Sequence, residues 1–294
     1  MTQATMIEID GLRFHVETAG DPAAPLLLFL HGFPEYSGAW EEMFERLSDA
    51  FFCVAPDQRG YGRSAKPAGV AAYATGKLAA DAAGVLTHFA PKAHAVIGHD
   101  WGASVAYALA ISRPDLVERL IILNGAHPIP FERALAAGGA QSAASQYFHL
   151  LRSDGAEAHL AADDFAALEA LFSKKMDMSW LRGARRDAYL RAWSAPGALT
   201  GMLNWYRATP LNVAAPGAPL AASERIPLDP ARLRVRPPHL LIWGAGDTAL
   251  LPEATEGLEE LCDELERAAI PGADHWIAHQ KPDEVAALIR GFRS

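Results

Sequence analysis

Short apolar runs alternate with amphipathic segments between residue 25 and about residue 123. Residues 26–30 form a continuous apolar run, which is typical of a parallel strand covered on both faces. Leu78, Ala82 and Val85 recur at the spacing of one helix face. Strands and helices in alternation predict a parallel, doubly wound sheet with right-handed crossovers. The predicted strands span residues 26–30, 51–55, 93–97 and 120–123, and the predicted helices span residues 40–47, 78–89 and 104–110.

The alternation breaks after residue 124. Residues 127–228 contain helical stretches and turns rich in alanine and glycine, but no convincing strand. Strand character returns at residues 239–243. The pattern predicts one α/β core, residues 1–126 and 229–294, interrupted by a helical cap at residues 127–228. The other predicted elements are a hairpin within residues 1–20 that turns at Asp10-Gly11, a helix near 256–265, a strand near 268–270 and a helix over 283–292.

Composition and charge narrow the class of partner. The chain has 294 residues, half of them apolar, which is enough for one large core with an inserted lobe. A formal net charge of -9 argues against nucleic acid or an anionic membrane as the main partner. No secretory leader pattern opens the chain, and no apolar run approaches the roughly 20 residues of a membrane span. We therefore expect a cytoplasmic protein.

The strongest chemical signal is Gly98-His99-Asp100-Trp101-Gly102, which lies between an apolar strand and a helix. Small residues two positions before and after Asp100 suit the sharp strand-to-helix turn called a nucleophile elbow. The backbone N–H of Trp101 would then lie at a helix N-terminus, where it favours developing negative charge. An isolated aspartate in this pattern would more often be a helix N-cap. The interpretation as a nucleophile therefore needs support from elsewhere in the chain.

Three further loops, each following a predicted strand, supply that support. His31-Gly32-Phe33-Pro34 follows the predicted strand at residues 26–30. We assign to Phe33 the second backbone N–H of an oxyanion hole, the first being that of Trp101. Asp247 follows the strand at 239–243, and His275 follows the last strand. In open α/β sheets, ligands bind at the edge formed by the carboxyl ends of the strands, where these loops lie. The nucleophile, the acid and the histidine also occur in the chain order of α/β-hydrolase triads. The sequence therefore predicts a triad of Asp100, Asp247 and His275.

The motifs together resemble the α/β-hydrolase-fold epoxide hydrolases. This resemblance runs from about residue 7 to residue 292 and is weakest in the first half of the insertion. It implies a mostly parallel, eight-stranded sheet flanked by helices, with a helical cap. Arg59, in a Gly-rich turn shared with related esterases and dehalogenases, is expected to brace loops. The matching motifs are His31-Gly32-Phe33-Pro34-Glu35, residues 57–64, Gly98-His99-Asp100-Trp101-Gly102 and Leu203-Asn204-Trp205-Tyr206-Arg207.

An aspartate nucleophile suits a different reaction from a serine nucleophile. Serine must lose a proton as it attacks, and it therefore suits acyl carbonyl groups. A carboxylate is already ionised at neutral pH and can displace a leaving group from an sp³ carbon. His275 would then deprotonate the water that hydrolyses the alkyl-enzyme ester, with Asp247 orienting its ring. The oxyanion hole would stabilise the tetrahedral intermediate of that second step.

The leaving atom distinguishes epoxides from alkyl halides. A halide leaves as a stable anion, whereas an epoxide oxygen leaves as a basic alkoxide and needs an acidic O–H donor close by. Tyrosine is a suitable acid. In the resembled family two cap tyrosines have this role. Tyr206 matches one of them clearly, and Tyr147 matches the other less well, because its neighbours depart from the usual aromatic-rich pattern.

Two other functions stay open at this point. Haloalkane and haloacetate dehalogenases use the same triad, and the Trp101 indole could donate to a halide. However, Phe33 stands where many haloalkane dehalogenases have an Asn donor. Haloacetate dehalogenases typically have Arg after the nucleophile and a His-Trp pair in the cap, where this chain has Trp101 and His149-Leu150. A non-catalytic ligand receptor would be favoured by a broken triad.

The sequence predicts a small apolar epoxide and water as the partners of the protein. The histidines show no metal-ligand spacing, and no phosphate loop or dinucleotide fingerprint is present, so we expect neither a metal nor a cofactor. Apolar side chains near the predicted triad are candidates for the substrate-binding wall. They are Phe33, Trp101, Phe131, Leu150, Leu151, Trp205 and Trp276.

Overall fold

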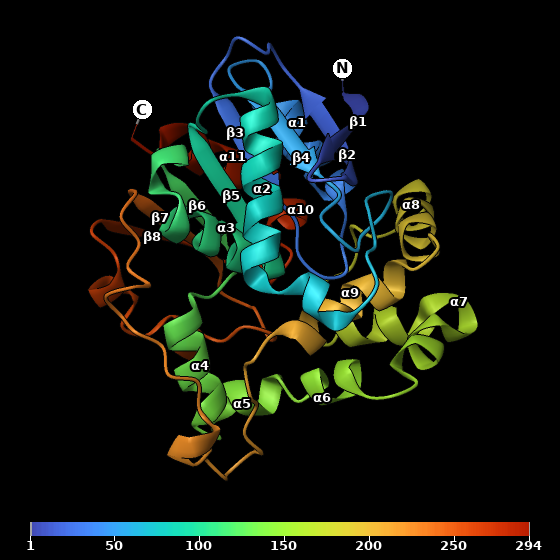
Figure 1. The fold of residues 1–294 in the computed structure, drawn as a ribbon, viewed down its shortest axis with the longest axis vertical. Coiled ribbons are helices and arrows are strands. Elements are labelled where there is room, and N and C mark those ends of the chain that lie inside the picture. The colour runs from blue at the N-terminus through green and yellow to red at the C-terminus, as the bar shows by residue number, and fades with distance from the viewer. Residues whose placement is uncertain (1, 294) are drawn as a thin grey trace.

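An eight-stranded sheet forms the centre of the molecule (Figure 1). The computed structural model describes residues 2–293. The strand order is β1-β2-β4-β3-β5-β6-β7-β8; the pairs β1–β2 and β2–β4 are antiparallel, and the other pairs are parallel. This confirms the mostly parallel, eight-stranded sheet. The strands are β1 (Gln3–Ile9), β2 (Leu12–Ala19), β3 (Leu26–Leu30), β4 (Phe52–Pro56), β5 (Ala95–His99), β6 (Leu120–Leu123), β7 (His239–Gly244) and β8 (Leu265–Ile270).

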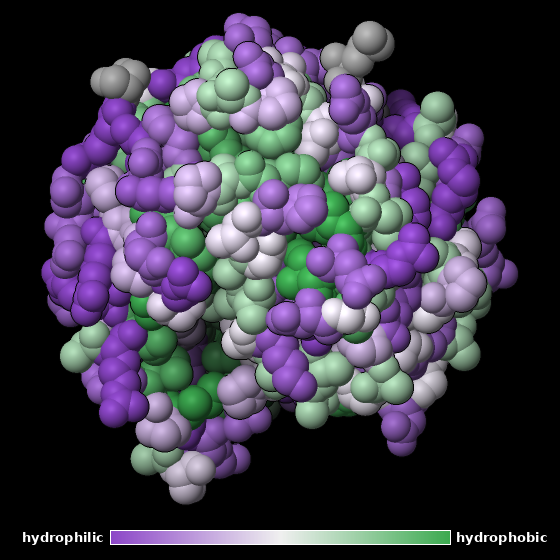
Figure 2. Space-filling view, turned by 45° about the horizontal axis from the view of Figure 1, so that its top comes forward, coloured by the Kyte–Doolittle hydropathy of each residue, from purple (hydrophilic) through white to green (hydrophobic). Residues whose placement is uncertain are grey.

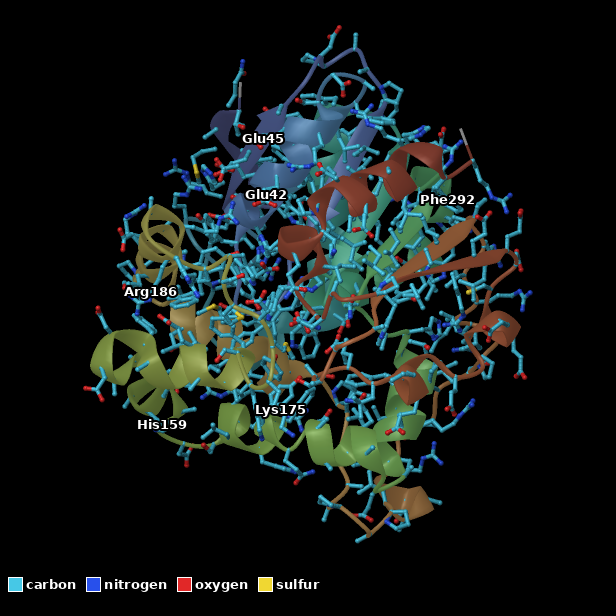
Figure 3. The ribbon with its side chains drawn as sticks, turned by 180° about the vertical axis from the view of Figure 1, so that it is seen from behind. Glu42, Glu45, His159, Lys175, Arg186 and Phe292 are labelled. Carbon is cyan, nitrogen blue, oxygen red and sulfur yellow. The ribbon has the colours of Figure 1, made fainter. Side chains whose placement is uncertain are left out.

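Helices cover both faces of the sheet. In β3, Leu26, Leu28 and Leu30 point into one apolar cluster and Leu27 and Phe29 into the other, as the two-residue period of a strand requires. Helices α2 and α3 pack on the first cluster, and α1, α10 and α11 pack on the second (Figures 1 and 3). The core helices are α1 (Glu41–Leu47), α2 (Thr75–Phe89), α3 (Trp101–Ser112), α10 (Ile277–Gln280) and α11 (Pro282–Gly291).

Six further helices lie between β6 and β7 in the chain and gather at one end of the sheet (Figure 1). We call this helical segment the cap; its domain boundaries, residues 127 and 228, stay predictions. Helix α7 contains a non-helical break at residues 162–165. The cap helices are α4 (Pro128–Ala136), α5 (Ala140–Ala144), α6 (Tyr147–Arg152), α7 (Ala156–Phe172), α8 (Ala184–Trp193) and α9 (Ala198–Ala208). Short 3-10 helices span Ser37–Trp40, Val70–Tyr73, Pro114–Leu116, Ala222–Glu224, Pro252–Thr255 and Leu258–Leu261.

Two predicted elements can be compared directly with the structure. The N-terminal hairpin is confirmed: Ile9 pairs with Leu12, and Asp10 and Gly11 both have positive φ, as a two-residue hairpin turn requires. The helix predicted near 256–265 is wrong. Only a 3-10 helix forms there, because Cys262 pairs with Val235 in a parallel bridge that draws the chain into an extended conformation ahead of β8.

One face of the molecule is mainly polar. On the face in Figure 2, polar side chains cover much of the area and apolar residues show between them. Within residues 2–293, no helix combines the length and the apolar character needed to cross a membrane. The large apolar side chains that are exposed in the same part of the chain are Met6, Val70 and Leu150.

Candidate active site

Asp100 occupies a sharp turn between β5 and α3. Its backbone has φ 51° and ψ -119°, a conformation that a non-glycine residue rarely adopts. Neighbouring glycines make the turn possible: a Cβ atom at Gly32 would collide with the Asp100 side chain, and one at Gly102 would collide with the carbonyl of Leu30. The small residues of the motif therefore allow the strand, the following helix and the neighbouring loop to approach closely.

The loop after β3 brings a backbone donor to this carboxylate. The N–H of Phe33 donates to Asp100 Oδ1 at 2.8 Å. Trp101 is the first residue of α3, so its N–H lies at a helix N-terminus. His31 behaves as a loop residue: its ring is buried, and its Nε2 accepts from the N–H of Gln58 at 3.1 Å.

The loops after β7 and β8 bring the other two predicted triad residues to the same place. His275 Nδ1 lies 2.8 Å from Asp247 Oδ2, and His275 Nε2 lies 3.6 Å from Asp100 Oδ2. The side chains of His275 and Asp247 are almost fully buried. Three residues separated widely in the sequence therefore form one chain of contacts at the carboxyl edge of the sheet.

Asp247 is held by donors that the sequence analysis missed. The Asn124 amide donates to Asp247 Oδ2 at 2.7 Å, and Asn124 Oδ1 accepts from the N–H of Gly244 at 2.8 Å. The N–H groups of Ala249 and Leu250 donate to Asp247 Oδ1 at 2.8 and 2.9 Å. Asn124 directly follows β6. A polar residue at the carboxyl end of a strand is the sequence signal that could have identified it as part of the site.

The site keeps opposite charges together. Burial alone would raise the pKa of Asp247, but His275 and the donated hydrogen bonds outweigh it and hold that pKa below its usual range. Burial alone would lower the pKa of His275; the carboxylates of Asp247 and Asp100 outweigh it and raise the pKa to about 9. The raised pKa therefore favours the protonated form of the His275 imidazole at neutral pH.

Both predicted cap tyrosines lie at the cap side of the site. Tyr206 on α9 is buried, and its ring packs edge-on against Phe33 and Trp101, with centroids 5.1 and 5.0 Å apart. Tyr147 begins α6, and its ring centroid lies 6.0 Å from that of Tyr206. Burial, together with the charge of Asp100, raises the pKa of both tyrosines. Both hydroxyls therefore stay protonated and able to donate at neutral pH.

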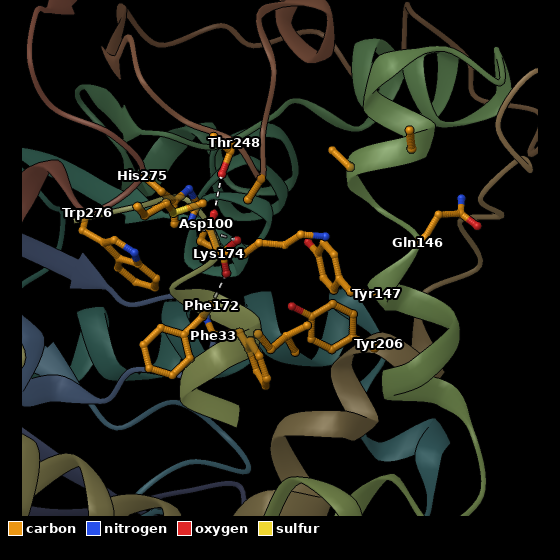
Figure 4. Close-up of a pocket in the computed structure, with 15 residues that line it drawn as sticks. Phe33, Asp100, Gln146, Tyr147, Phe172, Lys174, Tyr206, Thr248, His275 and Trp276 are labelled. Atoms are coloured by element: carbon orange, nitrogen blue, oxygen red, sulfur yellow. Dashed lines mark hydrogen bonds and ion pairs between the residues drawn. The ribbon is translucent and has the colours of Figure 1, made fainter. Parts of the chain in front are cut away.

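A cavity of about 140 Å³ joins the two halves of this site. Figure 4 shows Asp100 and His275 on one side, with Tyr147 and Tyr206 opposite them. Such a volume suits a small organic molecule, and its walls are mixed, with apolar groups around a few polar ones. The lining residues are Phe33, Asp100, Ala143, Ala144, Gln146, Tyr147, Leu171, Phe172, Lys174, Met176, Tyr206, Thr248, Ala249, His275 and Trp276.

Comparison with known proteins assigns the chain to a family. Residues 25–282 match the α/β hydrolase fold family. Mouse epoxide hydrolase 4 is 31% identical over 97% of this chain and 77% of its own, and the AB hydrolase superfamily protein YfhM of Bacillus subtilis is 34% identical over 96% and 95%. A solved epoxide hydrolase from metagenomes of hot environments superposes with a TM-score of 0.90 at 36% identity, covering 99% of this chain and 98% of its own. The chain belongs to the epoxide hydrolase family.

In this epoxide hydrolase family member, only part of the predicted wall lines the cavity. Phe33 and Trp276 do so, and Trp101 and Phe131 line a smaller adjoining pocket of about 20 Å³. Leu150 does not: the buried face of α6 carries Phe148 and Leu151, which leaves Leu150 exposed on the outside.

Trp205 also does not line the main cavity. It is buried on the other side of α9, where its indole N–H donates to the carbonyl of Arg59 at 2.9 Å. Trp205 therefore anchors the cap to the core. Arg59 itself is bonded to both carboxylate oxygens of Asp81 on α2 at 2.6 Å, and its predicted role as a brace between loops stays a prediction.

Other polar residues around the site were assigned no role from the sequence. Glu35 is buried and accepts from His99, His279 and Tyr189, while His99 Nε2 lies 2.9 Å from the carbonyl of His275. This network supports the His275 loop from behind. Within residues 2–293, no group of three or more His, Cys, Asp or Glu side chains is arranged to hold a metal ion.

Proposed function

We propose that the protein hydrolyses small apolar epoxides to vicinal diols through a covalent ester on Asp100. The observation that carries the proposal is the arrangement across one cavity: the half-buried carboxylate at the elbow faces the hydroxyl-bearing side chains of two cap tyrosines. A carboxylate nucleophile and O–H donors on opposite sides of a substrate are what epoxide ring opening needs. Membership of the epoxide hydrolase family supports the same reaction.

In the first step, Asp100 Oδ2 attacks one carbon of the epoxide ring, and the carbon–oxygen bond at that carbon breaks. Oδ1 already accepts from the Phe33 N–H, so it becomes the carbonyl oxygen of the ester while Oδ2 is free to attack. The released alkoxide takes a proton from Tyr206 or Tyr147. General-acid assistance of this kind typically contributes about 10²- to 10⁴-fold to a rate.

In the second step, His275 removes a proton from water, and the resulting hydroxide attacks the ester carbonyl carbon. The N–H groups of Phe33 and Trp101 stabilise the oxyanion that develops on Oδ1. Collapse of the tetrahedral intermediate releases the diol, with His275 returning a proton to the leaving oxygen. The proton of the carboxylic acid that remains on Asp100 restores the tyrosine hydroxyl, which regenerates both the carboxylate and the acid. Asp247 holds the imidazole in the required orientation through its Nδ1 contact of 2.8 Å.

Esterification itself prepares His275 for this role. The charge of Asp100 is one of the causes that raise the pKa of His275 to about 9. The ester of Asp100 is neutral, so the first step removes that contribution and lowers the pKa of the imidazole. A neutral imidazole can then act as a base at neutral pH.

An epoxide fits this site better than a halide does. The two cap tyrosines supply acidic O–H donors to a basic alkoxide, whereas a stable halide anion needs no proton. Haloalkane dehalogenation stays the alternative, because Trp101 lies beside Asp100 in the adjoining pocket. A substrate panel of styrene oxide, aliphatic epoxides, haloalkanes, haloacetates and p-nitrophenyl esters separates the two. Steady halide release without diol formation from any epoxide would favour the alternative.

A single turnover in ¹⁸O-water tests the covalent mechanism. With enzyme in excess, attack by Asp100 puts an unlabelled carboxylate oxygen into the first diol and puts the label into Asp100. Later turnovers then release label into the product. Direct attack of water on the epoxide would instead give a fully labelled first diol and an unlabelled Asp100. Mass spectrometry of the diol and of the peptide that contains Asp100 distinguishes the two results.

A further inference from the structure

Arg152 binds the end of the helix that carries Tyr206. It is the last residue of α6, the helix that begins with Tyr147. Its Nε donates to the carbonyl of Tyr206 at 2.8 Å, and its Nη2 donates to the carbonyls of Leu211 at 2.8 Å and Thr209 at 3.3 Å. One guanidinium therefore connects the two helices that supply the two tyrosines.

The sequence explains why the Tyr206 carbonyl needs this donor. The last carbonyls of an α-helix have no partner within the helix unless following residues supply one. The N–H of Thr209 bonds to the carbonyl of Trp205, but the next residue is Pro210, which has no N–H to offer to Tyr206. A cation is also favoured at this helix end by the helix dipole. Arg152 supplies the donor that Pro210 lacks.

Packing fixes the guanidinium at this position. It lies over the ring of Phe148, 5.2 Å from the centroid, and the Phe148 ring packs edge-on against Tyr206 at 5.0 Å. Arg152 is half-buried, and this burial lowers the pKa of its guanidinium. A planar fork with several donors suits this geometry better than a lysine would.

We infer that Arg152 is a positioning residue for ring opening: by tying α6 to the carboxyl end of α9, it holds Tyr147 and Tyr206 where both can donate to one epoxide oxygen. The inference rests on the proposed function. It concerns only the first chemical step, because Asp100, His275 and Asp247 are held by contacts of the core. Loss of Arg152 should therefore slow alkylation and leave ester hydrolysis nearly unchanged.

Arg207 offers a matched control. It lies on α9 next to Tyr206 and also joins two cap helices, through a bidentate contact with Glu157 of α7 at 2.6 and 2.9 Å. Among the described residues it makes no hydrogen bond to the carbonyl of Tyr206, and its only link to the end of α6 is a long hydrogen bond of 3.5 Å to the carbonyl of Ser153, the residue after that helix. An effect that came only from a loosened cap would appear in Arg207→Met as well as in Arg152→Met.

The test measures the two chemical steps separately by rapid quench and intact-protein mass spectrometry, with propylene oxide as substrate. In Arg152→Met we expect alkylation to slow about tenfold, since small misplacements of reacting groups are costly, while ester hydrolysis stays within about twofold of wild type. Arg152→Lys should recover part of the loss, and Arg207→Met should change neither step. Unchanged alkylation in folded Arg152→Met and Arg152→Lys, or an equal loss in Arg207→Met, would overturn the inference. No diol from the wild-type protein with any epoxide would instead defeat the proposed function.

A second substrate tests whether proton donation is the affected event. Trifluoromethyl-substituted propylene oxide opens to a less basic alkoxide, which depends less on acid assistance. We expect the alkylation defect of Arg152→Met to be smaller with this substrate than with propylene oxide. An equal defect with both substrates would contradict a role through the tyrosines.

Discussion

The two halves of the candidate active site are held in place by different balances of forces. On the core side, Asp247 accepts from Asn124 and from two backbone N–H groups, and it contacts His275 at 2.8 Å. On the cap side, the ring of Tyr206 is held by edge-on contacts with Phe33 and Trp101, and the hydrogen bonds of Arg152 reach only backbone carbonyls at the end of the Tyr206 helix. Hydrogen bonds are directional, whereas ring packing tolerates small shifts. A substitution in the core half should therefore block one chemical step of the proposed reaction, whereas a substitution in the cap half should only slow a step.

The largest effect is expected on the core side, from His275→Ala. Removing the base should slow ester hydrolysis by about 10²- to 10⁴-fold while alkylation still proceeds. Intact-protein mass spectrometry should then detect enzyme plus one substrate mass, localised to the peptide that contains Asp100. His149→Ala, which changes an exposed histidine outside the cavity, serves as the control. A folded His275→Ala protein that forms no adduct with a substrate of the wild type would contradict the two-step scheme.

A smaller effect is expected on the cap side, from Tyr206→Phe and Tyr147→Phe. Each variant loses one O–H but keeps its ring, so the protein should stay folded and single-turnover alkylation should slow by about 10²-fold or less. Tyr73→Phe loses a hydroxyl that donates to Pro67 away from the cavity, and it should leave the rate unchanged. Full alkylation rates in both cavity variants would show that the cap tyrosines are not the acids.

The charge coupling within the core half can be tested by titration. The pKa of His275 is about 9 in the folded protein, above its ordinary value of 6.5. Protonation of His275 therefore contributes to the free energy of unfolding in full below pH 6.5, and this contribution is lost as the pH rises through 9. Asp100→Ala removes one of the raising charges, so we expect a lower pKa of His275 by NMR and a smaller change in the urea midpoint between pH 6 and pH 10. An unaltered pKa in this variant would mean that esterification does not prepare His275.

The smallest effect is expected from Lys174, at the cap side of the cavity. Lys174 is the one cationic side chain of Lys or Arg among the lining residues, and Figure 4 shows it extending across the pocket. Lys174→Met should reduce kcat/KM for an epoxide that carries a carboxylate by about threefold relative to its neutral analogue, because exposed charge pairs are weak. Lys175→Met, next to it on the cap (Figure 3) but outside the cavity lining, should not alter this ratio. Equal ratios in all three proteins would exclude a role for Lys174 in selecting charged substrates.

The placement of the residues in the core half of the candidate site could be predicted almost completely from the sequence. Asp100, Asp247 and His275 each follow an apolar strand, and the carboxyl ends of parallel strands meet at one edge of the sheet. The local pattern at each loop was therefore enough to bring the triad together. The exception was Asn124: it also follows a strand, but its bond to Asp247 joins residues 123 positions apart and has no local motif.

Tertiary packing decided which side chains of the cap half face the cavity. The motif around Tyr206 indicated a role for that residue, but helix spacing alone could not tell which faces of α6 and α9 point into the cavity. Leu150 turned outward and Trp205 bonded to the core, because the packing of α6 and α9 on their neighbours set the rotation of each helix.

What the sequence determined by itself is the succession of strands and helices along the chain, the nucleophile elbow and the three loops of the predicted triad, because each depends on a strand period or a turn within a few residues. The tertiary structure decided which cap side chains form the cavity and which residue supports them. The bond between Arg152 and the Tyr206 carbonyl spans 54 positions and exists only because two helices pack side by side and Pro210 leaves that carbonyl without an N–H partner.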